Sequence, residues 1–215
     1  MLYSEYLLRR KTIELILIRH GETQWNNQRR IQGGSSDIEL NETGRNQAEK
    51  LGLSLKEREI NAIYSSPLKR ARDTAQAVAS HHNLEMHIEP GLRELEVGEL
   101  EGVTAESLGT DFSNFLIHWQ NGNGAEKLPG GGESLIDLQN RAWSVVKQIV
   151  DNNQGAAAVV THYFVILAVI SAALELPLPS IRRFRVQVSS ISILDFNNNR
   201  PCLKLLGDTC HLREA

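Results

Sequence analysis

The sequence predicts an α/β protein in which a mostly parallel central sheet lies between two layers of helices. Short apolar runs alternate along the chain with segments of helical periodicity, which is typical of this class. The first of these runs, Ile13–Ile18, is too apolar for a strand that has one face in solvent. The 215 residues provide enough chain for one large core, and no repeat or linker divides them. Residues 1–215 are therefore expected to form one domain.

Strands and helices alternate in the first half of the chain. Residues Ile13–Ile18 read IELILI, a β-branched apolar run that predicts a buried strand. Apolar residues at helical spacing predict a helix over Glu42–Arg58. A second strand is expected at Ala62–Tyr64. A helix should follow it, with Ser66 as the N-cap and Pro67 at the first helical position.

The second half continues this alternation after a glycine-rich interval. Residues 95–133 contain few regular signals and are predicted to form loops and short helices that cap the site. An amphipathic helix should begin at Ser134. The remaining predicted elements are a third strand at His87–Glu89, a fourth at Ala157–Thr161, a helix over Tyr163–Leu174 and two final strands at Ser190–Phe196 and Leu203–Leu206.

Composition and charge exclude several function classes. The formal net charge is -3, so the overall field does not attract nucleic acid or anionic lipid. Cys202 and Cys210 form neither a disulfide framework nor a zinc pattern, although a pair between them stays open. This cysteine usage favours a cytoplasmic location. The uncharged run Ala156–Leu174 approaches the length of a membrane span, but Thr161, His162 and Tyr163 interrupt it.

Polar side chains that could carry chemistry follow each of the four predicted strands. Arg19 and His20 follow the first, Arg70 the second, Glu94 the third and His162 the fourth. Because ligands of open α/β sheets bind at the carboxyl ends of the strands, these side chains are expected to share one crevice.

Such a set suits the hydrolysis of a phosphate monoester. Two guanidiniums can clamp the dianion, and one imidazole can attack phosphorus while the other stabilises charge. A carboxyl group can protonate the leaving oxygen and then activate water. Because protein groups supply the positive charge, neither a metal nor another cofactor is expected.

The segments that carry these residues resemble the histidine phosphatase superfamily, which is also called phosphoglycerate mutase-like. The resemblance runs in order over nearly the whole chain. Its segments are LILIRHGETQWN (Leu15–Asn26), IQGGSSDIELNETGRNQA (Ile31–Ala48), YSSPLKRARDTA (Tyr64–Ala75), LRELEVGELEG (Leu92–Gly102), PGGGES (Pro129–Ser134), VVTH (Val159–His162) and GDTCHL (Gly207–Leu212).

The resemblance implies roles for the matching positions. His20 would be the phosphorylated nucleophile, and Glu94 the proton donor. Arg19, Arg70, His162 and Asn26 would form the phosphate pocket, with Gln32 and Gly33 at its edge and Thr23 positioning the loop. Tyr163 stands where many members have glycine, so its ring is expected to narrow the site or touch substrate. For His211, substrate contact and simple packing remain equal alternatives.

The resemblance also implies a choice between hydrolysis and phosphoryl transfer. Glu96–Leu108 is acidic and lacks the RHYG-like segment of the cofactor-dependent phosphoglycerate mutases, which favours a phosphatase of the phosphohistidine type. The expected partner is a small phosphorylated metabolite. The alternatives are a phosphoglycerate mutase and a catalytically silent phosphate-binding regulatory domain. The physiological substrate and a possible homodimer stay open.

Overall fold

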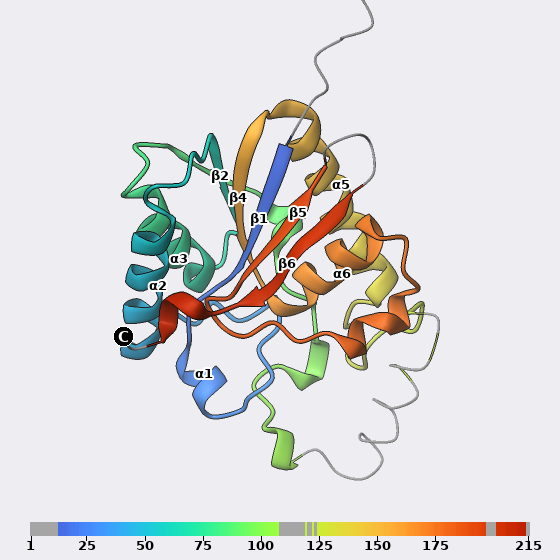
Figure 1. Ribbon diagram of the computed structural model, residues 1–215. Helices are drawn as coiled ribbons and strands as arrows, with labels where there is room; N and C mark the ends of the chain where they lie inside the picture. The colour runs from blue at the N-terminus through green and yellow to red at the C-terminus, as the bar shows by residue number, and fades with distance from the viewer. Residues whose placement is uncertain (1–12, 108–118, 120–121, 123, 197–200, 214–215) are drawn as a thin grey trace, which may run out of the picture.

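The protein contains one mixed sheet (Figure 1), seen in a computed structural model that describes residues 13–107, 119, 122, 124–196 and 201–213. The strand order is β3-β2-β4-β1-β5-β6. The strands are β1 (Ile13–Arg19), β2 (Ala62–Ser65), β3 (Met86–Ile88), β4 (Gly155–Thr161), β5 (Ile191–Asp195) and β6 (Cys202–Asp208). Strands β1 to β4 are parallel, whereas β5 and β6 pair antiparallel. The predicted mostly parallel sheet is confirmed.

Helices cover both faces of the sheet. On one face lie α2 (Glu42–Leu55) and α3 (Lys69–Ala79), and on the other α5 (Leu135–Asn152) and α6 (Tyr163–Ala173) (Figure 1). Side chains of β1 alternate between the two layers, because successive residues of a strand point to opposite faces. Ile16 and Ile18 belong to the core under α2 and α3, and Leu15 and Leu17 to the core under α5 and α6. The predicted three layers are therefore present.

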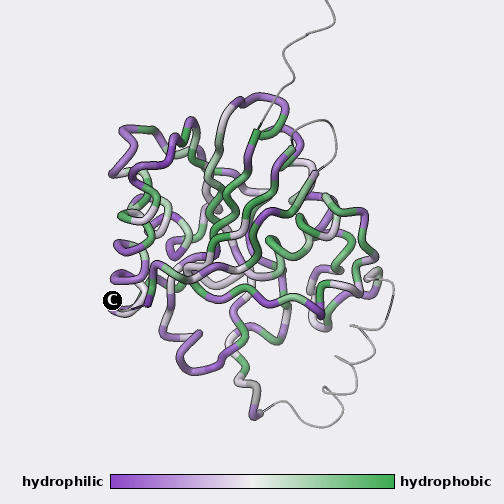
Figure 2. The backbone as a smooth tube through the Cα atoms, in the orientation of Figure 1, coloured by the Kyte–Doolittle hydropathy of each residue, from purple (hydrophilic) through white to green (hydrophobic). Residues whose placement is uncertain are grey.

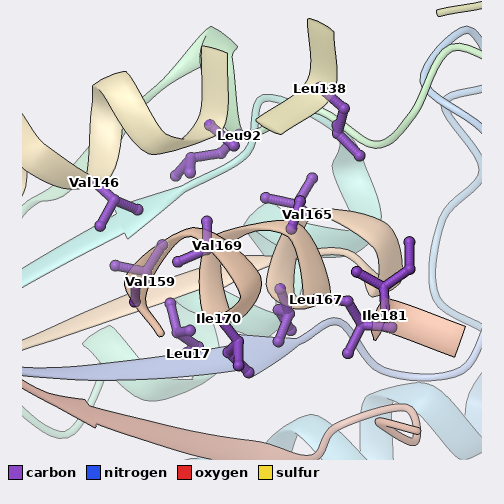
Figure 3. Packing of buried hydrophobic residues seen from close by; sticks show 14 of the residues in the cluster. Leu17, Leu92, Leu138, Val146, Val159, Val165, Leu167, Val169, Ile170 and Ile181 are labelled. Carbon is purple, nitrogen blue, oxygen red and sulfur yellow. The ribbon is translucent and has the colours of Figure 1, made fainter. Parts of the chain in front are cut away.

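Helix α6 consists mostly of apolar residues, and it is buried inside the protein. In Figure 3, Val165 and Val169 lie between strand residues such as Val159 and helix residues such as Val146. Figure 2 shows the same distribution, with hydrophobic segments in the central strands and hydrophilic ones outside. This packing accounts for the uncharged run. No helix among the described residues is long and apolar enough to cross a membrane.

The predicted start of α3 is wrong. The helix begins at Lys69 with Leu68 as its N-cap, not at Ser66 and Pro67. The Ser66 N–H instead extends the sheet by donating to Val160 O at 3.0 Å, and its hydroxyl contacts His162. Ser66 therefore lies before the helix, where its hydroxyl also accepts from the Leu68 N–H at 3.4 Å. The other helices and strands begin and end within about three residues of their predicted bounds.

The predicted cap, residues 95–133, is described only in part. It contains two short 3-10 helices, η2 (Gly98–Leu100) and η3 (Ala105–Ser107), while residues 108–118, 120–121 and 123 lie outside the described residues. Leu95, Val97 and Trp119 are buried in the core under α5 and α6. A capping role stays a prediction.

Both cysteines, Cys202 and Cys210, are free.

Candidate active site

The register of the parallel strands brings the two predicted catalytic histidines together. Arg19 of β1 pairs with Thr161 of β4, so His20 and His162 leave the sheet at the same level. The His20 N–H continues the ladder by donating to Thr161 O at 3.0 Å. The ring centroids lie 5.2 Å apart, which is close to the spacing of neighbouring strands.

The loop after β1 packs against α2 through two glycines. A Cβ atom on Gly21 would lie 2.6 Å from Gly44 O, and one on Gly44 would overlap Glu22 O. The Gly21 N–H donates to the hydroxyl of Thr74 on α3 at 3.0 Å. The main chain beside His20 is therefore fixed by both helices of this layer.

His20 is held as a neutral imidazole with one free nitrogen. Its Nδ1 lies 2.7 Å from Gly21 O, and because a carbonyl only accepts, Nδ1 carries the proton. Nε2 then keeps its lone pair. Burial lowers the pKa of His20 well below the ordinary 6.5, and the charges of Arg70 and Arg19 lower it further. At neutral pH the ring can act as a nucleophile.

His162 is oriented by a hydrogen-bonded chain from the start of α3. Its Nε2 lies 2.7 Å from the Ser66 hydroxyl, which accepts from the Leu68 N–H at 3.4 Å. The Ser66 hydroxyl can therefore donate to Nε2, leaving Nδ1 as the N–H that faces away from Ser66. Burial and the nearby charges of Arg70, His20 and Arg19 lower the pKa of His162 well below 6.5.

Arg70 is a fully buried cation beside these rings. Its Nη1 donates to Ser36 O at 2.8 Å, and its Nη2 to Gly33 O at 2.9 Å. Burial lowers the pKa of Arg70 to about 10, so the guanidinium stays charged at neutral pH. Arg19 is partly buried, with Nη1 donating to Val186 O at 2.9 Å.

Several buried nitrogens in this region lack an acceptor among the described residues. They are Arg19 Nε, Gln32 Nε2, Arg70 Nε and His162 Nδ1. An unsatisfied buried donor costs about 1–3 kcal/mol, so native proteins rarely leave several near one another. An anion with several oxygen atoms would satisfy them together, which makes this a candidate phosphate pocket.

Glu94 lies beside the pocket with a raised pKa. The side chain is 4% exposed, and its oxygens accept from the Leu95 N–H at 2.8 Å and the Phe164 N–H at 3.3 Å. Burial raises the pKa of Glu94, although the two amides and the charges of Arg70 and Arg19 oppose this shift. A carboxyl group in this environment can hold a proton for transfer.

The sequence that forms this site matches a known protein family. The model of the histidine phosphatase superfamily, branch 1, matches residues 15–209. The chain belongs to the histidine phosphatase superfamily. The resemblance predicted from the motifs is confirmed.

Among similar members of the superfamily, one is named as mutase-like and others are named as phosphatases. Phosphoglycerate mutase-like protein 4 of Arabidopsis thaliana is 34% identical over 94% of this chain and 88% of its own length. A phosphoserine phosphatase structure from Entamoeba histolytica, in complex with phosphoserine, has a TM-score of 0.83 and 31% identity and covers 94% of this chain and 100% of its own. A mycobacterial glucosyl-3-phosphoglycerate phosphatase has a TM-score of 0.83 and 27% identity, covering 93% and 100%.

Arg141 of α5 is a site residue that the sequence interpretation missed. Its guanidinium donates to Gly91 O at 2.8 Å, Arg93 O at 2.7 Å and Glu94 O at 3.0 Å. It also binds both carboxylate oxygens of Glu133 at 2.7 and 2.9 Å. One side chain therefore fixes the loop that carries Glu94. A sequence signal existed, because Arg141 interrupts the apolar stripe of its helix between Leu138 and Ala142.

A second polar network contains Thr23, predicted to position the loop, Asn26, predicted in the phosphate pocket, and the predicted edge residues Gln32 and Gly33. The Thr23 hydroxyl contacts Asn26 Oδ1 at 3.1 Å and Gln32 Oε1 at 2.9 Å. Because its Oε1 accepts from the Thr23 hydroxyl, Gln32 keeps its Nε2 as a donor that has no acceptor among the described residues. The Gly33 N–H donates to Glu101 Oε1 at 2.9 Å, so Glu101, also missed, supports the loop that binds Arg70.

Tyr163 and His211 lie near the segments that carry Arg19 and His20. The Tyr163 ring lies under Arg19, with the guanidinium carbon 5.1 Å from its centroid. His211 lies in η6 (Cys210–Leu212), next to Ser189, whose N–H donates to His20 O at 3.0 Å. Substrate contact by either residue stays a prediction.

Proposed function

We propose that this protein is a phosphomonoester hydrolase that forms a phosphohistidine on His20. One observation carries the proposal. A neutral imidazole with a free Nε2 lies beside buried N–H donors that have no acceptor among the described residues and suit an anion rich in oxygen atoms. His20, at 3% exposed, is the imidazole that an incoming ester would meet first, since His162 is 0% exposed.

In the first step, His20 Nε2 attacks phosphorus and the ester P–O bond breaks. Glu94 gives its proton to the departing alcohol oxygen, so the alcohol leaves neutral. Arg19, Arg70 and His162 stabilise the charge on the non-bridging oxygens. In the second step, Glu94 removes a proton from water, the water oxygen attacks phosphorus, and the N–P bond breaks to regenerate His20.

Hydrolysis is favoured over transfer because residues 96–108 supply carboxylates rather than cations. Glu96 accepts from the Ser35 hydroxyl at 2.6 Å, and Glu101 accepts from Gly33. A cofactor-dependent phosphoglycerate mutase would hold the carboxylate of phosphoglycerate with cations from this segment while the phosphoryl group moves. The phosphatase names of the solved relatives agree with hydrolysis, whereas the name of the Arabidopsis relative keeps a mutase in competition.

A substrate screen tests the proposal directly. We expect the protein to release inorganic phosphate from small phosphomonoesters without a metal, because two guanidiniums supply the positive charge. Phosphate release should be unchanged by EDTA. Interconversion of 2- and 3-phosphoglycerate should be at least about tenfold slower than hydrolysis of the best ester. Faster interconversion than release would make the protein a mutase, and loss of activity in EDTA would contradict the metal-free mechanism.

The pH dependence of the rate should be bell-shaped. His20 must be neutral to attack, and its lowered pKa places the rising limb below pH 6.5. Glu94 must be protonated, so the rate should fall as pH rises through its pKa, which burial raises above 4.5. Glu94→Gln should remove the falling limb and lower kcat for alkyl phosphates by about 10²–10³-fold. Initial rates between pH 4 and 9 provide the measurement.

The matched control for this pH prediction is the exposed neighbour Glu99. Glu99→Gln should retain both limbs and the wild-type kcat. A falling limb that persisted in Glu94→Gln would assign the proton donor to another group.

Arg141→Lys should weaken catalysis by misplacing Glu94. Lysine cannot donate to three carbonyls and a carboxylate together, so the loop carrying Glu94 should loosen. We expect kcat for alkyl phosphates to fall about tenfold, with a much smaller loss for 4-nitrophenyl phosphate, whose leaving group needs no proton. Glu133→Gln, which removes the bidentate partner, should behave alike. Equal losses for both esters would leave Arg141 with a purely structural role.

We also propose that the protein acts in the cytoplasm on small phosphorylated metabolites. Two free, exposed cysteines and a net charge of -3 support this, and nucleic-acid or membrane partners are not expected. A single domain spanning 1–215 and a possible homodimer stay predictions.

A further inference from the structure

A cavity of about 210 Å³ opens next to the phosphate pocket, on the outer side of α6. It lies between the first turns of α6, the start of α5, and η4 (Leu178–Arg183) with the residues that follow it. Figure 3 shows two of its wall residues, Leu167 and Ile181, close together. Among the described residues, those that line the cavity are Trp119, Leu135, Tyr163, Phe164, Leu167, Ile181, Arg182 and Arg185.

The cavity adjoins the groups that would cleave a phosphoester. Tyr163 and Phe164 directly follow His162 in the chain, and the Tyr163 ring supports the guanidinium of Arg19. The Phe164 N–H donates to Glu94 at 3.3 Å. A leaving group protonated by Glu94 therefore departs beside this wall. A second cavity, lined by Ile13 and Trp143, contacts the start of β1, at the opposite end of the parallel strands, and cannot serve this purpose.

The cavity wall has two chemical parts. Trp119, Leu135, Phe164, Leu167 and Ile181 are apolar, with the Trp119 and Phe164 rings edge-to-face at 6.2 Å between centroids. The other part carries two exposed arginines and, among the described lining residues, no carboxylate.

Arg185 is held in place at this wall. Its Nη1 donates to Phe184 O at 2.8 Å and Arg182 O at 2.6 Å. The Phe184 carbonyl also accepts from the Tyr163 hydroxyl at 3.3 Å, which links the arginine to the ring under Arg19. A guanidinium anchored through one nitrogen loses less freedom when its remaining N–H groups bind a carboxylate.

We propose that this cavity binds the leaving group and selects phosphomonoesters of an apolar alcohol that carries a carboxylate. The inference rests on the proposed phosphatase function. The apolar wall binds the carbon chain, while Arg185 binds the carboxylate at the far end. The ester oxygen remains beside Glu94, and the phosphoryl group remains at His20.

A series of alkyl phosphates tests the apolar part of the cavity. The wild-type kcat/KM should rise from methyl to hexyl phosphate, because each buried methylene contributes up to about fourfold. The leaving-group chemistry is nearly constant along the series, so the rise reports binding. A flat series would contradict the apolar subsite.

Matched esters with and without a carboxylate test Arg185. We expect 6-(phosphonooxy)hexanoate to exceed hexyl phosphate in kcat/KM. Arg185→Gln should lower kcat/KM for the carboxylate ester about fivefold, and leave that for hexyl phosphate unchanged. Arg183→Gln is the control, since this exposed arginine does not line the cavity, and should change neither value.

The outcomes separate this proposal from the proposed function. If the esters are hydrolysed but Arg185→Gln affects both equally, the carboxylate assignment is wrong while the phosphatase stands. If no ester in the series is hydrolysed, and 4-nitrophenyl phosphate is also inert, the phosphatase function itself fails.

Discussion

Replacing His20 with alanine is expected to lower phosphate release by about 10⁴-fold or more, the largest effect of any single substitution. The reason is the loss of the attacking nitrogen, which removes the covalent route altogether. Rates should be measured with the best ester of the screen. Rapid quenching after mixing with ³²P-labelled ester should trap an acid-labile, alkali-stable phosphoprotein in the wild type and none in the variant.

His81 provides the control for this experiment. It is exposed in the turn after α3, so His81→Ala should keep the wild-type rate and the labelled intermediate. Equal phosphate release by the His20 variant and the wild type would remove the enzyme assignment. A phosphate-binding regulatory domain would then be the better description of the protein.

Arg70→Lys should lower kcat/KM by about 10²–10³-fold and also lower stability. Lysine retains the charge but loses the planar fork that binds two backbone carbonyls while Nε stays available for a ligand. The carbonyls of Gly33 and Ser36 would also lose their donor, so the free energy of unfolding should fall by about 1–3 kcal/mol. Steady-state kinetics, inhibition by inorganic phosphate and thermal melting provide the measurements.

Arg72 allows a matched comparison on the same helix. It is exposed two residues away, and Arg72→Lys should leave kinetics and melting unchanged. If Arg70→Lys weakened only stability, with kcat/KM intact, Arg70 would be a structural cation and the phosphate clamp would need other donors.

The sequence could predict the meeting of His20 and His162 because both follow buried parallel strands. Strand ends of this kind share one edge of the sheet whatever their separation in the chain. The same reasoning placed Arg70 and Glu94 nearby. The antiparallel direction of β5 and β6 was not predicted, since an apolar run shows no direction. Residues 196–201 alone separate the two strands, and a connection this short is too short for a parallel crossover.

Arg141, Ser66 and Glu101 were missed for a different reason. Arg141 and Ser66 act through partners far along the chain, and three of the Arg141 partners are carbonyls, which every residue possesses. Such contacts have no residue-type signature of their own, and only the place of Arg141 in the apolar stripe of α5 was a signal. The N-cap prediction for Ser66 is wrong because α3 begins at Lys69, and the Ser66 hydroxyl binds His162 as well as the Leu68 N–H.

Gly21 of the loop after β1 packs against Gly44 of α2, and this contact connects two motifs that are far apart in the sequence. Gly21 in RHG and Gly44 in NETG touch through main-chain atoms, so neither can gain a methyl group without moving the other's segment. A homologue with a larger residue at position 44 would be under pressure to reshape the turn beside its catalytic histidine, although that residue never meets a substrate.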